Sequence, residues 1–329
     1  MASAEQIRTL VSSFAQRDDE KFRTVALDIA AAAAKAGDPR LADSLRMLVD
    51  RSRRTVLPTV GPRAVPIMRP EGELSALISV SYPKIRLVDM VLSDDVRASL
   101  TRVLVETRAG DRLREHSLEP RRRLLLAGPP GCGKTMSAKA LAGETGLPLM
   151  VVQFHALITK FMGETAAKLH GIFQAMHSTR GIYLFDEFDV LATSRGDAND
   201  VGEARRIVNS FLQLVEQDDS ESIIVAATNR PEALDRAVFR RFDDMIEFAR
   251  PAPEMVRLLV ENRLAALSPL RLDWKVLNTE AKGLSHAEVV KACEDAAKAV
   301  VLGQASTVTT VLLAKTLRAR RSPKPKARR

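Results

Sequence analysis

The sequence is poor in cysteine, with only two among 329 residues. Cys132 and Cys293 stand far apart, and neither has neighbours at the spacing of a metal site or a disulfide framework. The sequence also contains no His-Glu-x-x-His motif, and its five histidines do not pair at ligand spacing, so we expect no zinc site. This scarcity favours the reducing environment of the cytoplasm.

Long hydrophobic runs are missing as well. No uninterrupted stretch approaches the ~18 apolar residues that a membrane-spanning helix requires. Glu5, Arg8 and Arg17 place charges where a targeting peptide would have a continuous apolar segment. We therefore expect neither secretion nor contact with a membrane interior, and we predict a cytoplasmic protein.

Acidic residues are absent from residues 315–329, which contain eight basic residues. Most of the formal net charge of +9 therefore lies in this segment, and the rest of the chain is nearly balanced. No helix-turn-helix pattern or basic groove is evident elsewhere, so a DNA-handling role is not favoured. The segment could contact nucleic acid, an anionic membrane or an acidic partner, or it could be a disordered, solvated end, and the sequence leaves these alternatives open.

The pattern of apolar residues divides the chain into five segments. Helical periodicity near the start, with Ile7, Leu10 and Phe14 on one face, predicts a small helical unit. Three short helices bury little surface, so we expect the unit to lean on neighbouring parts or to act as an adaptor that engages substrates. A dense set of prolines and glycines then predicts a linker. The predicted segments are the N-terminal helical unit at 1–55, the Pro/Gly linker at 56–73, an α/β core at 74–250, a helical lid at 251–317 and a disordered basic tail at 318–329.

The core alternates short apolar runs with amphipathic segments. This alternation predicts an α/β fold, a parallel sheet with helices on both faces. Strands buried on both faces are expected to be continuously apolar, as 182–185 and 223–227 are. After Pro253 only helical periodicity remains, which predicts an all-α lid. Strands are predicted near 123–127, 148–153, 181–186, 222–228 and 244–248, and helices near 133–145, 164–178, 201–217 and 231–239.

A glycine-rich loop follows the strand predicted at 123–127. Residues 128–135 read Gly-Pro-Pro-Gly-Cys-Gly-Lys-Thr, which has the pattern of the phosphate-binding loop of P-loop NTPases. The backbone N–H groups of this loop and of the following helix start are expected to face the phosphates of ATP. Lys134 is expected to reach the β- and γ-phosphates, and Thr135 to offer its hydroxyl to Mg²⁺. The predicted nucleotide contacts here are Gly128, Pro129, Pro130, Gly131, Cys132, Gly133, Lys134, Thr135 and Met136.

Two carboxylates end the buried strand predicted at 181–186. Such groups are tolerated at the end of an apolar strand where a cation or a water molecule needs them. Asp186 is expected to hold Mg²⁺ through water, and Glu187 to polarise the water that attacks the γ-phosphate. Asn229 follows the next buried strand, where its amide can bond that water or the γ-phosphate. These residues together predict ATP hydrolysis.

These motifs resemble the AAA subfamily of the AAA+ ATPases across residues 75–315. Residues 234–243 read Leu-Asp-Arg-Ala-Val-Phe-Arg-Arg-Phe-Asp and are similar to the second region of homology of that family. In the family, arginines of this region reach the γ-phosphate bound by the adjacent subunit, and the resemblance assigns Arg240 and Arg241 to that role. The compact Arg-Arg-Phe form is similar to that of katanin and spastin. The resemblance also implies a homo-hexameric ring.

Two further segments resemble functional parts of the family. Residues 158–164 are similar to its pore loop, in which an aromatic and an aliphatic residue grip a threaded polypeptide, and Phe161 and Met162 take those places. Residues 283–288 resemble a lid motif at the adenine and ribose, which adds His286 and Ala287 to the expected nucleotide contacts. His286 stands where the family usually has glycine.

The resemblance implies a ring-forming ATPase that pulls on or unfolds protein substrates. The alternative is an ATP-dependent assembly switch, which binds partners in its ATP state and threads nothing. Because the sequence has no metalloprotease motif, any proteolysis would come from a separate chain. Residues 118–135, 158–167 and 192–211 resemble bacterial AAA ATPases whose companion is a subtilisin-like serine protease, in systems of plasmid incompatibility or phage defence.

Overall fold

The computed structural model describes residues 77–153, 165–191, 198–267 and 271–321, together with four isolated positions between 25 and 32. The chain divides into two compact units, Met1–Ala64 and Val65–Arg329, and the division falls within the segment predicted as a linker. The four isolated positions belong to the first unit, and all other described residues belong to the second. Apart from those four positions, the predicted N-terminal helical unit, the linker and the pore loop lie outside the described residues.

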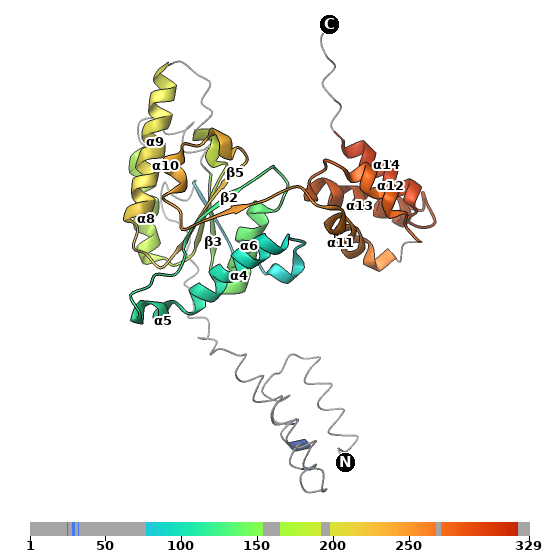
Figure 1. Ribbon diagram of the computed structural model, residues 1–329, viewed down its shortest axis with the longest axis horizontal. Coiled ribbons are helices and arrows are strands. Elements are labelled where there is room, and N and C mark those ends of the chain that lie inside the picture. The colour runs from blue at the N-terminus through green and yellow to red at the C-terminus, as the bar shows by residue number, and fades with distance from the viewer. Residues whose placement is uncertain are drawn as a thin grey trace. The chain divides into compact units, whose positions relative to one another are not determined.

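A six-stranded sheet organises the α/β part of the second unit (Figure 1). The five strands predicted from the sequence are all present, and all of them are parallel. A further strand pairs antiparallel at one edge, so the sheet is mixed rather than wholly parallel. That strand has four residues, two of them serines, and is too short and polar to be recognised from the sequence. In spatial order the strands are β1 (Ile78–Ser81), β3 (Leu149–Gln153), β4 (Ile182–Asp186), β5 (Ile223–Thr228), β2 (Arg123–Ala127) and β6 (Asp244–Glu247).

Helices cover both faces of the sheet, as the repeating strand and helix pattern predicts. On one face lie α8 (Thr165–Ser178) and α9 (Ala198–Gln217), and on the other lie α4 (Asp94–Arg108) and α6 (Lys134–Thr145) (Figure 1). The shorter helices of this part are η2 (Leu87–Asp89), α5 (Gly110–Glu115), η3 (Phe188–Leu191), η4 (Pro231–Ala233) and α10 (Arg236–Phe239).

The central strands direct alternate side chains into two hydrophobic clusters. In β4, Tyr183 and Phe185 join the cluster on the α8 and α9 side, and Leu184 joins the cluster on the α4 and α6 side. Phe185 packs edge-on against Phe211 of α9, with 4.8 Å between ring centroids. Fully burying side chains of this size stabilises the fold by about 1.5–3 kcal/mol each. A strand buried on both sides must therefore be apolar until it reaches the sheet edge, where Asp186 stands.

The helix predicted at 231–239 is wrong in one respect, because two short helices occupy this segment. The break falls at Leu234 and Asp235, which have extended backbone conformations. The Asp235 carboxylate accepts a hydrogen bond from the backbone N–H of Ala237 at 3.0 Å and caps α10. An aspartate at a helix start satisfies a free N–H group, and this local gain separates the second helix from the first.

The C-terminal part is a separate bundle of helices with its own core. The helices are α11 (Pro253–Leu264), η5 (Ala265–Leu267), α12 (Trp274–Ala281), α13 (His286–Val301) and α14 (Thr310–Arg320). Val260, Leu277, Val289 and Leu313 are completely buried in its hydrophobic cluster. The predicted all-α lid is therefore present.

Residues 318–320, predicted as part of the disordered basic tail, instead belong to a helix. Helix α14 continues to Arg320, because its arginines find acidic partners on neighbouring helices. Arg318 pairs with Glu280 at 2.6 Å, and Arg320 pairs with Asp295 of α13. Residues 322–329 lie outside the described part of the chain. Among the described residues, none of the helices combines the length and the apolar character needed to cross a membrane.

Candidate nucleotide-binding site

The loop between β2 and α6 has the backbone geometry of a phosphate cradle. Gly128, Gly131 and Gly133 have φ values of 144°, 75° and 106°, in the region that favours glycine. At Gly128 an added Cβ would lie 2.1 Å from the carbonyl oxygen of Phe248, so a side chain cannot be accommodated there. These glycines let the loop turn closely around an anion and aim its N–H groups inward. The residues present therefore fit a nucleoside triphosphate.

Lys134 begins α6 and reaches back over this loop. Its ammonium group donates hydrogen bonds to the carbonyl oxygens of Gly128 at 2.7 Å and Pro129 at 3.0 Å, and to Oδ1 of Asn229 at 2.8 Å. The side chain is buried, and burial lowers the pKa of Lys134, an effect that the nearby Asp186 carboxylate opposes. A buried ammonium whose described partners are neutral oxygens is well placed to bind phosphate oxygens.

Thr135 and Asp186 meet across the mouth of the cradle. The Thr135 hydroxyl donates a hydrogen bond to Asp186 Oδ2 at 2.9 Å, and so joins α6 to the end of β4. Oxygen ligands of this kind suit Mg²⁺, which usually takes one or two protein ligands and completes its shell with water and phosphate. Among the described residues, no three His, Cys, Asp or Glu side chains gather into a metal-binding cluster.

Glu187 and Asn229 flank this pair at the ends of adjacent strands. Glu187 has a φ of 57°, a conformation rarely adopted by a residue with a side chain, and its backbone N–H donates to Asp186 Oδ1 at 3.0 Å. Strain of this type costs about 1–3 kcal/mol and persists where the surroundings hold it in place. Its carboxylate is exposed, so it is free to hold a water molecule.

The sequence interpretation missed Asp189, which lies in η3. Its carboxylate accepts a hydrogen bond from the backbone N–H of Asn229 at 3.1 Å and holds the end of β5 against the segment after β4. The signal was available, because Asp189 is the third acidic residue in four positions after the apolar strand. An isolated turn aspartate is common, however, and only the structure shows which backbone group it receives.

The lid contacts the loop through the start of α13. The backbone N–H of Ala287 donates to the carbonyl oxygen of Gly131 at 3.0 Å, and a Cβ on Gly131 would lie 2.8 Å from the Ser285 hydroxyl. Burial raises the pKa of the Cys132 thiol, which also accepts a hydrogen bond from the backbone of His286. The two predicted lid contacts, His286 and Ala287, therefore lie beside the predicted phosphate loop.

The His286 side chain has an unusual environment. Both of its ring nitrogens are buried and lack a hydrogen-bond partner within the described part of the chain. Burial lowers the pKa of His286 and favours the neutral imidazole. The neighbouring Glu288 is used structurally, since its carboxylate accepts hydrogen bonds from the backbone N–H of Ser285 at 2.7 Å and from its hydroxyl at 2.8 Å. Glu288 thus caps α13.

The predicted arginine pair lies apart from the cluster around Lys134, which consists of Lys134, Thr135, Asp186, Glu187 and Asn229. Arg240 and Arg241 follow α10 and precede β6, which runs parallel to β2 with Asp244 opposite Leu124. They therefore lie at the beginning of β2, whereas the phosphate loop leaves its end. Arg240 is exposed, and Arg241 forms an ion pair with Glu216 near the end of α9. Phe161 and Met162, the predicted pore-loop residues, lie outside the described residues.

The sequence matches known proteins over its core and over most of its length. A family model for the ATPase family associated with various cellular activities (AAA) matches residues 124–250. An uncharacterized AAA family ATPase of Sinorhizobium fredii, y4kL, is 34% identical over 308 residues, which cover 92% of this chain and 90% of that protein. The chain belongs to the AAA family of ATPases. This AAA ATPase is thus a nucleotide-binding enzyme.

Other relatives match a single region of larger proteins. The nuclear valosin-containing protein-like protein of Mus musculus is 36% identical over 182 residues, covering 53% of this AAA ATPase and 21% of the relative. The ATP-dependent zinc metalloprotease FtsH 1 of Symbiobacterium thermophilum is 38% identical over 180 residues, covering 53% of this chain and 30% of the protease. This AAA ATPase therefore spans less than a third of those two relatives.

A solved structure has the same fold. The crystal structure of the FIGL-1 AAA domain matches this AAA ATPase with a TM-score of 0.61 at 23% identity, covering 80% of this chain and 95% of that domain. A second structure of the FIGL-1 domain, in complex with ADP, matches with a TM-score of 0.59 at 23% identity, covering 77% of this chain and 90% of that chain. The likeness establishes a P-loop α/β fold with a helical lid.

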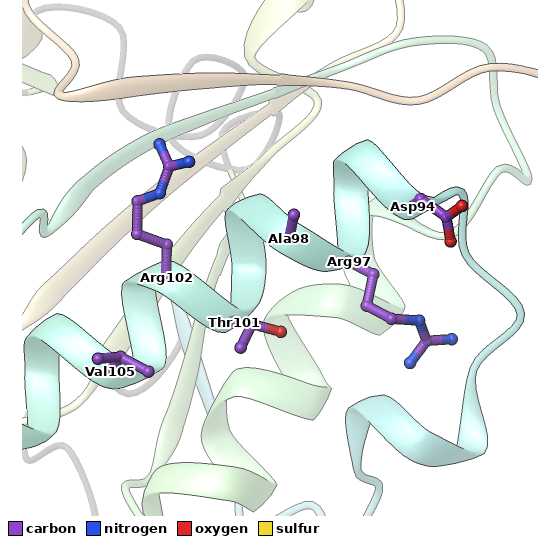
Figure 2. Close-up of a pocket in the computed structure, with 6 residues that line it drawn as sticks. All are labelled: Asp94, Arg97, Ala98, Thr101, Arg102 and Val105. Carbon is purple, nitrogen blue, oxygen red and sulfur yellow. The ribbon is translucent and has the colours of Figure 1, made fainter.

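A surface pocket of about 560 Å³ lies elsewhere, along α4 (Figure 2). Arg97 and Arg102 project from this helix on either side of Thr101. The pocket shares no residue with the cluster around Lys134. It is therefore separate from the candidate nucleotide-binding residues.

Proposed function

We propose that this AAA ATPase assembles into a ring, hydrolyses ATP with Mg²⁺, and uses the cycle to remodel or unfold protein substrates. The observation that supports this most strongly is that two sets of residues lie at opposite ends of β2. The cluster around Lys134 follows the end of β2, and the pair Arg240 and Arg241 lies at its beginning. Each chain thus carries a nearly complete hydrolysis site and a separate pair of cations.

Each residue of the cluster around Lys134 has its own role in the proposed hydrolysis. Lys134 binds the β- and γ-phosphate oxygens in place of its present carbonyl partners. Thr135 and Asp186 would hold Mg²⁺, Asp186 through water, and the bound metal would supply positive charge beside the phosphates. Glu187 orients and polarises the attacking water, and Asn229 bonds the γ-phosphate or that water. General-base assistance of this kind contributes typically about 10²–10⁴ in rate.

The arginine pair is too far from its own cradle to act there. A strand of five residues spans about 16 Å, which exceeds the reach of an arginine side chain. The guanidinium groups are therefore available to a second copy of the chain, as in the katanin-like and spastin-like arrangement that the Arg-Arg-Phe form resembles. An arginine supplied in this way is worth about 10³–10⁵ in rate. Hydrolysis then depends on assembly, and we propose a homo-hexamer.

The substrate-handling part of the proposal rests on the sequence. Phe161 and Met162 would grip an unfolded polypeptide in the centre of the ring, and the N-terminal helical unit would engage clients. A companion protease of the subtilisin-like serine class, in bacterial defence or plasmid maintenance, is a further proposal based on resemblance. We place the activity in the cytoplasm. We propose that the basic tail is the one part of the chain suited to contact nucleic acid. An assembly switch that hydrolyses ATP without threading is the second candidate.

Mixing two inactive variants tests the core of the proposal. The Glu187→Gln variant should bind ATP without hydrolysing it, and the Arg240→Ala/Arg241→Ala double variant should hydrolyse it slowly. In mixed assemblies the intact arginines of the first variant face the intact hydrolysis sites of the second, so the ATPase rate should recover. Absence of recovery in assemblies shown by native mass spectrometry to contain both variants would refute action between subunits.

Trapping separates threading from the assembly switch. The tagged Glu187→Gln variant is recovered from its native cell in ATP, and bound proteins are identified by mass spectrometry. A client that is retained by Glu187→Gln and lost from a Phe161→Ala/Glu187→Gln double variant indicates threading. Recovery of the ring alone favours the assembly switch.

A further inference from the structure

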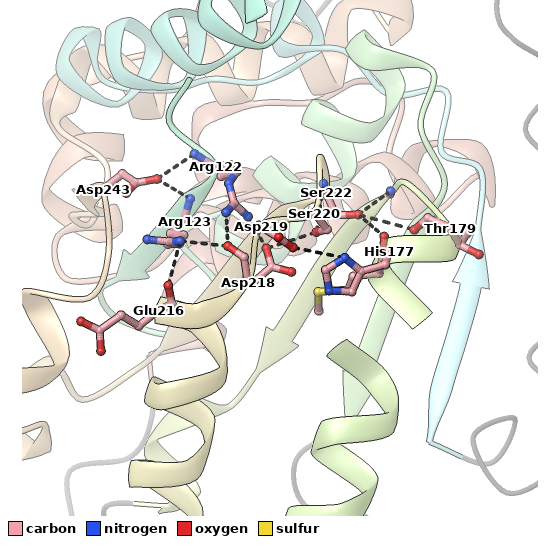
Figure 3. A network of polar contacts seen from close by, with 12 residues as sticks. Arg122, Arg123, His177, Thr179, Glu216, Asp218, Asp219, Ser220, Ser222 and Asp243 are labelled. Carbon is pink, nitrogen blue, oxygen red and sulfur yellow. Dashed lines mark hydrogen bonds and ion pairs between the residues drawn. The ribbon is translucent and has the colours of Figure 1, made fainter. Parts of the chain in front are cut away.

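Asp243 directly follows the Arg-Arg-Phe segment and is held by the beginning of β2. One of its carboxylate oxygens accepts hydrogen bonds from the backbone N–H groups of Arg122 and Arg123, both at 2.9 Å (Figure 3). The backbone N–H of Asp243 in turn donates to the carbonyl oxygen of Arg123 at 2.8 Å. Three hydrogen bonds thus fix this aspartate to one end of the strand whose other end leads to the phosphate loop.

The side chains of the same two arginines hold the end of α9. Arg122 binds both the carboxylate and the carbonyl oxygen of Asp218, whose side chain is completely buried. Arg123 donates to the carbonyl oxygens of Asp218 at 3.0 Å and Glu216 at 3.2 Å. Figure 3 shows both guanidinium groups directed toward this helix end. The beginning of β2 is therefore tied to the end of α9 as well as to Asp243.

Glu216 links the start of β2 to the arginine pair. Its carboxylate pairs with Arg241, while its carbonyl oxygen receives Arg123. Phe242, between Arg241 and Asp243, is only 8% exposed and packs in the cluster beneath α9. The arginine pair is thus anchored on its C-terminal side by Asp243 and Phe242, and Arg241 is restrained further by Glu216. We call Arg122, Arg123, Glu216, Asp218 and Asp243 the arginine clamp.

We propose that Asp243 is a positioning residue, which through the arginine clamp sets the direction in which Arg240 and Arg241 leave the subunit. This inference rests on the proposed action of those arginines on a neighbouring subunit's nucleotide. The clamp makes no contact with the subunit's own phosphate loop, which lies at the far end of β2. Loss of the clamp should therefore slow ATP hydrolysis at the neighbouring subunit's site. It should leave ATP binding at the subunit's own site unchanged.

The clamp also leaves Arg240 and Arg241 in different situations. Arg241 is engaged by Glu216, whereas Arg240 is exposed. An exposed ion pair contributes little in water, so Glu216 can direct Arg241 without preventing its transfer to a phosphate. The three hydrogen bonds of Asp243 are therefore the stronger restraint, and Asp243 is the residue to change first.

Three variants measured in the assembled full chain test the proposal. In Asp243→Ala the backbone N–H groups of Arg122 and Arg123 lose their acceptor, and kcat should fall up to about 100-fold, the cost of a displacement near 1 Å. The KM for ATP and the affinity for a fluorescent ATP analogue should change little. Asp243→Asn keeps an oxygen acceptor and should recover much of the rate.

Asp219→Ala is the matched control. Asp219 neighbours the clamp and is exposed, but it pairs with His177 and contacts neither Arg122 nor Arg123 (Figure 3). Its removal should leave kcat unchanged. A fall in kcat for Asp219→Ala equal to that for Asp243→Ala would show that any lost carboxylate in this region suffices, and it would overturn the proposal.

Complementation distinguishes positioning from misfolding. Asp243→Ala subunits mixed with Glu187→Gln subunits should regain hydrolysis, because intact arginines of the second variant reach the sound nucleotide site of the first. If Asp243→Ala had damaged its own site, mixing would restore nothing, and the proposal would be wrong. Should this variant not fold, the same mixing with Glu216→Ala, in which Arg241 loses its carboxylate partner, gives the decision.

Comparing the Arg240→Ala/Arg241→Ala variant with Asp243→Ala distinguishes a failure of the clamp proposal from a failure of the proposed function. If the Arg240→Ala/Arg241→Ala variant loses activity while Asp243→Ala keeps the parental kcat, action between subunits stands and the clamp proposal is overturned. If the double variant keeps the parental rate, the proposed function of the arginines fails, and the clamp proposal fails with it. A loss in both, with rescue of Asp243→Ala by Glu187→Gln, supports both.

Discussion

Lys134 Nζ lies 2.8 Å from Asn229 Oδ1, so the first residue of α6 is joined to the residue that follows β5. The two are separated by 95 positions in the chain. They meet because β2 and β5 are adjacent and parallel, which brings their carboxyl ends to the same edge of the sheet. A side chain that can bind phosphate and one that can sense the γ-phosphate are therefore in direct contact.

Asp189 should control the position of Asn229. We expect Asp189→Ala to lower kcat roughly ten- to a hundredfold, because the hydrogen bond to the Asn229 backbone is lost and small displacements at the reacting centre are costly. Asp189→Asn retains an oxygen acceptor and should lose less. Steady-state kinetics with parallel ATP-binding measurements would show a change in kcat much larger than any change in affinity.

Asp273→Ala serves as the control for that experiment. Asp273 caps α12 in the lid by accepting hydrogen bonds from Lys275 at 2.9 Å and Val276 at 3.3 Å. Its loss should lower the melting temperature without lowering kcat well below that temperature. An equal loss of kcat in Asp189→Ala and Asp273→Ala would mean that Asp189 has only a structural role.

Gly128→Ala should disrupt the cradle. The new Cβ would lie 2.1 Å from the Phe248 carbonyl oxygen, so the backbone would have to shift to remove the clash. Overpacking of this kind should lower the free energy of unfolding by about 1–3 kcal/mol, and the positive φ adds further strain. Gly146→Ala is the comparison, since Gly146 has a φ of 71° but no atom within 4 Å of an added Cβ. Thermal unfolding should show the larger loss for Gly128→Ala, together with loss of ATP binding.

The two cysteines should resist alkylation. Both thiols are buried, and burial raises the pKa of Cys293 from 9.0 to about 12 and also raises the pKa of Cys132. A raised pKa leaves less of each thiol as thiolate at a given pH, and the thiolate is the reactive form. Mass spectrometry after treatment with iodoacetamide at pH 8 should show modification only on unfolding. Rapid labelling of Cys132 with loss of ATPase activity would contradict this prediction.

Acid should destabilise the surroundings of His286. Because burial lowers the pKa of His286 below 6.5, the folded chain resists protonation that the unfolded chain accepts. Well above pH 6.5 His286 is neutral in both states and does not affect stability. As the pH falls from 6.5 toward the lowered pKa of the folded chain, the free energy of unfolding decreases. Thermal unfolding between pH 5 and 8 should therefore show a smaller acid loss in His286→Ala. An unchanged pH profile would indicate that the imidazole finds a partner.

Much of the sheet could be predicted because its strands are buried on both sides. The run from Ile182 to Phe185 is apolar throughout, and its boundary with the first carboxylate marks the sheet edge. β1 escaped prediction because an edge strand of four residues has only one neighbour and tolerates serine. The extent of α14 also escaped, since Arg318 and Arg320 are ordered by acidic partners far away in sequence.

The sequence by itself determined the chemistry of the loop and strand ends. Lys134, Thr135 and Asp186 are set by local spacing, because a glycine loop after a buried strand and carboxylates at a strand end need only their neighbours in the chain to be recognised. The tertiary structure alone decided that Asp189 receives the Asn229 backbone and that Asp243 binds the start of β2. Those contacts depend on which strands lie side by side, and strand order is settled by long-range packing that no local pattern encodes.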